Sequence, residues 1–252
     1  MRRAFSLIEL LVVIAVVALL VGITLPALGI AIRAARTSKC LSQTRDIVLA
    51  VANDAASNGD LLPENRTRIN ETEHVTWRHR FVETARVPSA EAFVCPLHPG
   101  EPLSEVGQPD HETVCVGDVP SSYALNGHLL WRRSVNGREA IRRVSSVSRP
   151  AHTILLAESR ARFPDIRVTN QLVAADDELG GFYGFWHSGD GVYGFIDGHA
   201  ETINFMDTGS PDCRWHDGRD MNDDPFSPQS RAELRPHDHP DWEYLAHPVY
   251  FD

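Results

Sequence analysis

His187 and Asp197 are the residues of this chain whose types are most typical of acid–base chemistry. A histidine with a carboxylate partner can donate or accept a proton during a reaction. Nine residues lie between the two, and Gly198 follows Asp197 directly. This spacing brings with it neither a nucleophile nor a third, orienting group. We therefore expect an architectural role, in which Asp197 takes the first position of a tight turn and His187 anchors the approach to a hairpin through hydrogen bonds.

Glu158 closes the apolar run TILLA and is a second candidate partner for His187. A hydrogen bond between these two side chains would form a buried tie between strands. The same residues keep another interpretation open, in which His187, Asp197 and Glu158 form a metal or acid–base site.

Four cysteines could form disulfides or bind a metal: Cys40, Cys95, Cys115 and Cys213. They lack the paired C-x-x-C spacing of a zinc site, so we do not expect thiolate–metal chemistry. Disulfides become possible if the body of the protein lies outside the cytoplasm. The sequence does not choose among the pairings. Cys95 with Cys115 is the first to test, because the loop between them is short and polar.

Two polar clusters near the end of the chain could also bind metal ions. Oxygen ligands in a flexible loop suit calcium, and the aspartates that could supply them are Asp207, Asp212, Asp217, Asp220, Asp223 and Asp224. The histidines that could bind a transition metal are His237, His239 and His247. No EF-hand order is present, and acidic loops are usually just solvated. We expect no cofactor, with calcium as the alternative, and predict irregular structure from Thr208 to Asp252.

Glu9 lies in an otherwise apolar N-terminal segment. No charged residue occurs from Leu10 to Ile32, and a helix over these residues would be about 35 Å long, enough to cross a bilayer core of about 30 Å. An ionised carboxylate at the edge of a hydrocarbon layer costs a few kcal/mol. Its presence indicates either a partner of opposite charge or a side chain that reaches the water at the interface.

One continuous helix is predicted from about Phe5 to about Ser57. Pro26 removes one hydrogen bond and is expected to kink this helix without ending it. Residues 5–32 form the apolar half, whereas in residues 33–58 apolar side chains recur every three or four positions, which predicts an amphipathic half. Asn58-Gly59 is a good C-terminal cap. The expected core contacts of the amphipathic half are Leu41, Val48 and Val51.

Residues 59–252 have the scattered prolines, glycines and short apolar runs of a loop-rich β domain. The predicted strands are Thr153–Ala157, Val192–Ile196 and His199–Ile203. A two-residue Asp-Gly connection is a strong hairpin signal and should join the last two strands. The predicted fold class is therefore α+β, with a long N-terminal helix packed on a small antiparallel sheet. The net charge of −10 argues against a nucleic-acid partner.

The first residues resemble the processing site of type IV prepilins and type II secretion pseudopilins. The string AFSLIE, residues 4–9, carries the resemblance together with the apolar run that follows it. The distal half is similar to prepilin-like proteins with an H-x9-D-G element, here His187 to Gly198. Three further strings are also similar: FVCP (Phe93–Pro96), SYALN, which ends at Asn126, and RPAHTILLAES (Arg149–Ser159).

The resemblance implies how the N-terminus is processed. Prepilin peptidase would cut between Ala4 and Phe5, removing residues 1–4 as a leader, and would methylate the new amine of Phe5. This sequence has Ala4 where glycine is usual, which affects the efficiency of cleavage. Glu9 would then be the fifth residue of the mature chain and pair with the amine of Phe5 on a neighbouring subunit during assembly.

The resemblance also implies a place and partners for the chain. It would be a single-pass inner-membrane protein with an extracytoplasmic domain, later part of a pilus or secretion pseudopilus. Copies of itself or related pilins, the peptidase, an assembly platform and membrane lipid would be its partners. The positive-inside rule by simple count favours the opposite orientation, because Arg33, Arg36 and Lys39 outnumber Arg2 and Arg3.

Two other functions remain open at this point. One is a membrane-anchored extracytoplasmic hydrolase that uses His187 and Asp197. The other is a surface binding module on the same anchor, which does not polymerise. We expect the protein not to be an enzyme.

Overall fold

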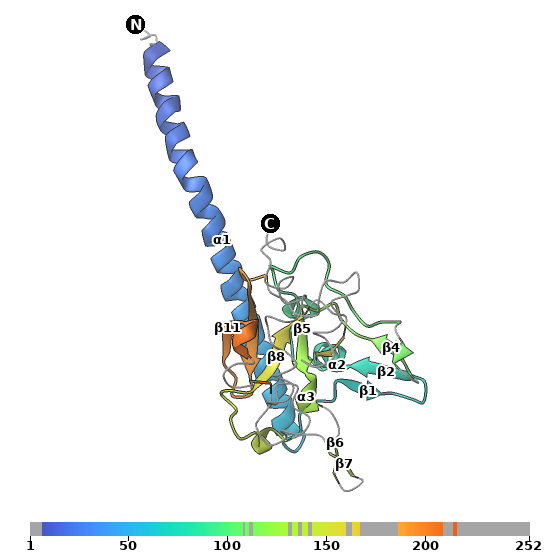
Figure 1. Cartoon of the computed structure of the whole chain (residues 1–252). Coiled ribbons are helices and arrows are strands. Elements are labelled where there is room, and N and C mark those ends of the chain that lie inside the picture. The colour runs from blue at the N-terminus through green and yellow to red at the C-terminus, as the bar shows by residue number, and fades with distance from the viewer. Residues whose placement is uncertain are drawn as a thin grey trace, which may run out of the picture.

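A computed structural model describes residues 7–107, 109–110, 113–130, 133–135, 138–140, 143–159, 163–166, 186–208 and 214–215. One long helix, α1 (Leu7–Ser57), precedes a domain of short strands, small helices and loops. The first half of α1 extends away from this domain, and the second half lies against it (Figure 1). The α+β fold class predicted from the sequence is confirmed.

Helix α1 follows the sequence prediction closely. It runs without interruption through Pro26 and ends at Ser57, the predicted residue. Gly59 has a φ of +67°, the left-handed conformation that glycine adopts readily after a helix. Its 51 residues correspond to about 75 Å at 1.5 Å per residue.

The two halves of α1 have different surroundings. Residues 7–36 are all exposed. The buried residues of the helix begin at Cys40 and recur with helical spacing as Thr44, Ile47, Val48, Ala50, Val51, Asp54 and Ala55. Val48 and Val51 are among the predicted core contacts, and Leu41 packs against the same core while partly buried. The predicted packing face is therefore confirmed.

The larger sheet lies against the amphipathic half of α1. Its strand order is β11-β10-β8-β5-β9, and α1 contacts β8, β10 and β11. The strands are β5 (Tyr123–Asn126), β8 (Ile154–Glu158), β9 (Asp165–Ile166), β10 (Asp190–Phe195) and β11 (Ala200–Asn204). All pairs are antiparallel except β5 with β9. Each of the predicted strands is present, displaced by one or two residues.

A second sheet lies on the far side of the domain from α1 (Figure 1). Its order is β1-β2-β4-β3, and β2 runs parallel to β4. The strands are β1 (Arg66–Arg68), β2 (Glu73–Thr76), β3 (Pro109–Asp110) and β4 (Thr113–Gly117), and a separate hairpin joins β6 (Arg133–Val135) to β7 (Arg138–Ala140). These strands were not predicted. Most of them have only two to four residues, which are too few positions for alternation to be recognised.

Short helices connect the sheets to the core. They are α2 (Trp77–Glu83), α3 (Gly127–Leu130), η1 (Ala90–Phe93), η2 (Val144–Ser146) and η4 (Phe205–Thr208). The Thr76 side chain caps the start of α2 by accepting a hydrogen bond from the backbone N–H of His79. Trp77 stacks edge-on against both Phe81 and Phe93, which joins α2 and η1 to one core.

The turn between β10 and β11 differs from the predicted two-residue hairpin. The N–H of Phe195 donates to the carbonyl of His199, and the N–H of Gly198 donates to the carbonyl of Phe195. Asp197 does not have the positive φ that a type I′ turn needs, whereas Gly198 has a φ of +98°. This is the three-residue loop made of a type I turn and a glycine bulge. Asp197 is thus the third residue of the turn, and its expected place in the first position was wrong.

Gly194 allows α1 to approach the middle of β10 closely. A Cβ at this position would lie 2.5 Å from Cγ2 of Val48 and 2.9 Å from Cγ2 of Thr44. Both neighbours are completely buried on the helix, so they have no free space into which they could move.

Gly194→Ala should therefore destabilise the domain by about 1–3 kcal/mol through overpacking. Gly29→Ala is the matched control, because a Cβ at Gly29 meets nothing within 4 Å. Denaturant unfolding of the purified chain in detergent measures both changes. Equal stability of the two variants would contradict the close packing of α1 on β10.

Candidate functional site

The N-terminal candidate residues are only partly within the described structure. Ala4 and Phe5 lie outside the described residues. Glu9 lies on an exposed surface in the first turns of α1. The helix is long and apolar enough to cross a membrane, and none of its most apolar 18-residue window is buried. The domain therefore leaves uncovered a hydrocarbon surface that extends over the whole first half of α1.

A disulfide joins α1 to the domain at the point where the helix becomes buried. It links Cys40 on α1 to Cys95, which follows η1, with the two Cα atoms 5.3 Å apart. Cys115 is a buried free cysteine, so the pairing of Cys95 with Cys115 favoured from the sequence was wrong. Cys213 lies outside the described residues. Loop closure depends only weakly on loop length, so proximity in sequence was a poor guide to this pairing.

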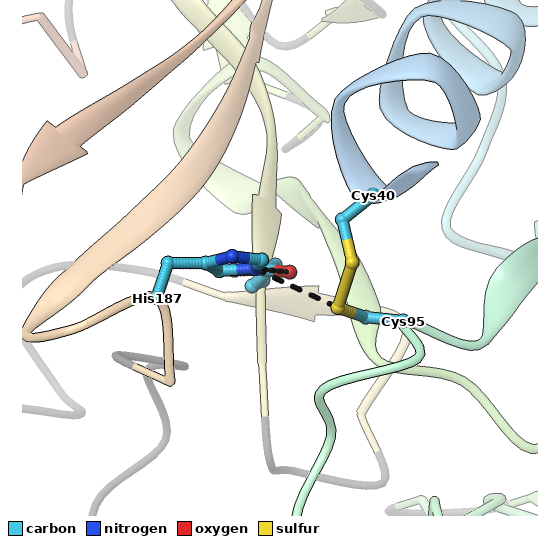
Figure 2. Close-up of side chains that lie close together, drawn as sticks. Cys40, Cys95 and His187 are labelled. Atoms are coloured by element: carbon cyan, nitrogen blue, oxygen red, sulfur yellow. Dashed lines mark hydrogen bonds and ion pairs between the residues drawn. A yellow bond between two sulfur atoms is a disulfide. The ribbon is translucent and has the colours of Figure 1, made fainter. Parts of the chain in front are cut away.

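The imidazole of His187 lies beside this disulfide (Figure 2). Its Nε2 is 2.9 Å from Oε1 of Glu158 and 3.6 Å from Sγ of Cys95, and its Nδ1 is 3.0 Å from the hydroxyl of Thr37 on α1. In the tautomer with its proton on Nε2, the ring donates a hydrogen bond to the carboxylate of Glu158 and accepts one at Nδ1 from the hydroxyl of Thr37. His187 therefore connects α1, the disulfide and β8.

The carboxyl group of Glu158 receives three donors inside the domain. Oε1 accepts from Nε2 of His187 and from the indole N–H of Trp186 at 3.2 Å, and Oε2 accepts from the backbone N–H of Val192 at 2.9 Å. Burial raises the pKa of Glu158 above its usual value, and the bonds from His187, Val192 and Trp186 oppose this rise. The predicted buried tie between Glu158 and His187 is confirmed.

The strings that carry the distal resemblance meet at this junction. Cys95 belongs to FVCP, Glu158 to RPAHTILLAES and His187 to the H-x9-D-G element. Ser122 of SYALN connects them: its hydroxyl accepts from the N–H of Cys95, and its carbonyl accepts from the N–H of Ser159. Residues up to 150 positions apart thus form one cluster, which we call the junction cluster: Thr37, Cys40, Cys95, Ser122, Glu158, Trp186 and His187.

His187 and Asp197 do not pair with each other in the structure. Oδ1 of Asp197 accepts from Nδ1 and from the backbone N–H of His199 at the turn. His187 is at the opposite end of β10, where it forms a bridge with Asp190. The expected anchoring role of His187 agrees with this bridge, whereas the acid next to its ring is Glu158.

The junction cluster has the features of a structural support. Both ring nitrogens of His187 have partners among the described side chains, and the thiols of Cys40 and Cys95 are joined to each other. One donor atom from each of Cys40, Cys95, Glu158 and His187 lies within 4.8 Å of the others. Cys40 and Cys95 could bind a metal ion here only as free thiolates, which the disulfide does not offer.

Several other predictions concern residues outside the described ranges. Of the aspartates considered for calcium only Asp207 is described, and it is exposed on η4. The tail histidines also lie outside the described part of the chain. Sequence analysis missed Thr37 and Trp186. Thr37 lies three residues before Cys40 on the helix face that reaches the domain, and Trp186 directly precedes His187. Neither a threonine nor a tryptophan at such a position indicates by itself that it contacts a histidine or a buried carboxylate.

Replacing both disulfide cysteines, Cys40→Ser/Cys95→Ser, should lower the free energy of unfolding by about 2–4 kcal/mol, because the bridge closes a loop of about 55 residues. Denaturant titration under oxidising and reducing conditions measures this. Reductant should lower the stability of the unaltered protein and leave that of the double variant unchanged. A wild-type midpoint that does not respond to reductant would refute the role of the bridge.

Glu158→Gln should destabilise the domain by about 1–3 kcal/mol, because an amide cannot accept all three hydrogen bonds and must turn an N–H toward a donor. Glu201→Gln is the control: Glu201 pairs with Arg214 while 44% exposed, and exposed pairs contribute about 0–1 kcal/mol. Thermal unfolding compares the two variants. A loss for Glu158→Gln no larger than that for Glu201→Gln would contradict the junction described here.

Comparison with known proteins gives one match. Residues 1–25 match the family model described as a prokaryotic N-terminal methylation motif. No curated protein and no solved structure matches the chain. The chain therefore carries an N-terminal methylation motif at the start of a helix that fits a single membrane anchor.

Proposed function

We propose that the chain is a prepilin-like structural subunit that prepilin peptidase cuts between Ala4 and Phe5 and that then assembles into a type IV pilus or type II secretion pseudopilus. The observation that carries this proposal is the methylation motif over residues 1–25, which includes the first part of a membrane-length helix with Glu9 in its first turn. Its activity is assembly, which needs neither enzymatic chemistry nor a cofactor.

The uncovered half of α1 supports assembly through helix bundling. Residues 7–36 are exposed, and their apolar side chains need either lipid or other helices around them. In a bundle the amine of a cleaved Phe5 is a cation in a surrounding of low dielectric constant. Glu9 of a neighbouring subunit neutralises it, and loss of one partner from a buried ion pair costs about 3–5 kcal/mol.

The Cys40–Cys95 disulfide supports an extracytoplasmic domain. Disulfides form and persist in oxidising compartments such as the periplasm and are rare in the cytoplasm. With the domain outside, residues 5–32 anchor the chain in the inner membrane. Its partners are copies of itself or related pilins, the peptidase, membrane lipid and an inner-membrane assembly platform, and nucleic acid is not among them.

The junction cluster gives α1 and the domain a fixed relation in this proposal. A subunit drawn from the membrane by its helix must carry its domain along without unfolding it. The disulfide and the His187–Glu158 pair connect the helix to the domain at the level where the apolar half ends. His187 therefore acts through packing and hydrogen bonds in our proposal.

Mass spectrometry of the mature N-terminus tests the proposal in cells with and without the peptidase. We expect an N-methylated Phe5 only where the peptidase is present. Glu9→Val should block incorporation into fibres and leave membrane insertion intact, whereas Glu71→Gln, a change at an exposed acid of the β domain, should assemble normally.

An N-terminus that retains Met1 in both strains would overturn the proposal. An anchored hydrolase or binding module using His187 and Asp197 would then be favoured, and a hydrolytic activity lost in both His187→Ala and Asp197→Asn would identify the hydrolase. Normal fibres from Glu9→Val would refute the charge pairing.

A further inference from the structure

A second cluster of metal-ligating side chains lies in the four-stranded sheet, away from α1. His74 is on β2, Cys115 is on the neighbouring strand β4, and Glu105 lies on the loop that precedes β3. His74 and Cys115 are partners in the register of the two parallel strands. One donor atom from each of the three residues lies within 4.8 Å of the others. The exposed fractions of the residues are only 1%, 3% and 1% for His74, Glu105 and Cys115.

The imidazole of His74 points one unpartnered nitrogen into this cluster. Its Nδ1 lies 2.8 Å from the hydroxyl of Thr113. Its Nε2 has no hydrogen-bond partner within the described structure and lies 3.7 Å from Oε2 of Glu105. A buried polar atom without a hydrogen bond costs about 1–3 kcal/mol. The bond at Nδ1 also orients the ring, as the second nitrogen of a metal-bound histidine usually does.

Glu105 is held in position by charges and by its backbone. Both of its carboxylate oxygens accept from the guanidinium of Arg66. The N–H of Glu105 donates to Oδ2 of Asp118, which is itself paired with the fully buried Arg78. The guanidinium of Arg66 holds the carboxylate in place, and the carboxylate oxygens keep further lone pairs that can bind a metal ion.

Cys115 contributes a free thiol to the cluster with His74 and Glu105. Burial raises its pKa to about 11, so without a cation nearby the sulfur stays protonated. It donates weakly to the carbonyl of Gly117 at 3.5 Å. The neighbours Val114 and Val116 face outward, so the alternation of β4 is what directs Cys115 into the cluster.

We propose that His74, Glu105 and Cys115 bind a divalent transition-metal ion of the zinc type. Imidazole, thiolate and carboxylate together are zinc ligands, whereas calcium takes oxygen ligands only. Bond lengths of about 2.0–2.3 Å place tetrahedral ligand atoms about 3.3–3.8 Å apart, so the cluster closes on an ion through small side-chain movements. Binding releases the thiol proton of Cys115 to solvent, and water fills the fourth position.

This site would have a structural consequence. The ion joins β2, β4 and the loop that carries Glu105, none of which the disulfide reaches. The rival explanation is a protonated His74 paired with Glu105, in which the thiol plays no part. Only the metal site involves the sulfur of Cys115, so a measurement of sulfur–metal bonding distinguishes the two explanations.

Cobalt(II), a spectroscopic substitute for zinc, tests the site in the full-length chain. The protein is purified in detergent, freed of metal with a chelator and kept oxidised, so that the Cys40–Cys95 bridge stays closed. We expect one equivalent of cobalt to bind with a thiolate-to-metal charge-transfer band. Cys115→Ser should abolish this band, and His74→Asn should weaken binding at least tenfold. Cys213→Ser, the matched control, should leave the band unchanged.

Absence of the charge-transfer band in the unaltered protein would overturn the proposal. So would a band that survives Cys115→Ser and disappears in Cys213→Ser, because the metal would then belong to another part of the chain. If the Cys115 variant does not fold, X-ray absorption on the zinc-loaded unaltered chain decides. One sulfur neighbour at about 2.3 Å supports the site, and a shell of oxygen and nitrogen alone refutes it.

Discussion

The buried carboxylate of Glu158 holds His187 and Trp186, the two side chains that lie against the disulfide where the helix joins the domain. Without this carboxylate, the N–H of Val192 and Nε2 of His187 would lose the oxygen that they bond to, and the indole N–H of Trp186 would keep only the sulfur of Cys95 at 3.3 Å. A buried acid is unfavourable unless hydrogen bonds compensate it, so β8, β10 and the segment before β10 must come together for the domain to form. The disulfide then closes over this arrangement and holds α1 against it.

The division of α1 follows from this attachment. Cys40 is the first fully buried residue of the helix, and Thr37, one turn earlier, is the first to contact His187. Beyond these two residues no element of the described structure covers the apolar side chains, and the helix extends alone (Figure 1). A membrane or a bundle of other helices must supply the missing surroundings. In the assembly that we propose, Glu9 would meet the opposite charge that a carboxylate in a low-dielectric medium requires.

The parts of the fold that could be predicted are those governed by local pattern. The apolar run, the three- and four-residue spacing around Val48 and the Gly59 cap are properties of neighbouring positions, and α1 ends at the predicted Ser57. The strand around Leu156 was recognisable for the same reason. The turn at Asp197 was predicted to exist but with the wrong geometry, because Asp-Gly fits both a two-residue hairpin and a type I turn with a glycine bulge.

By itself, the sequence determined a membrane-length helix that begins with a methylation motif and continues into an amphipathic half. Tertiary structure alone decided which cysteine pairs with Cys40 and that His74 comes to lie beside Cys115. It also selected Glu158 over Asp197 as the acid next to His187, although the sequence offered both. The physical reason is that these contacts join residues far apart in the chain. Loop-closure entropy changes little between one such partner and another, so the packing of the strands selects among them.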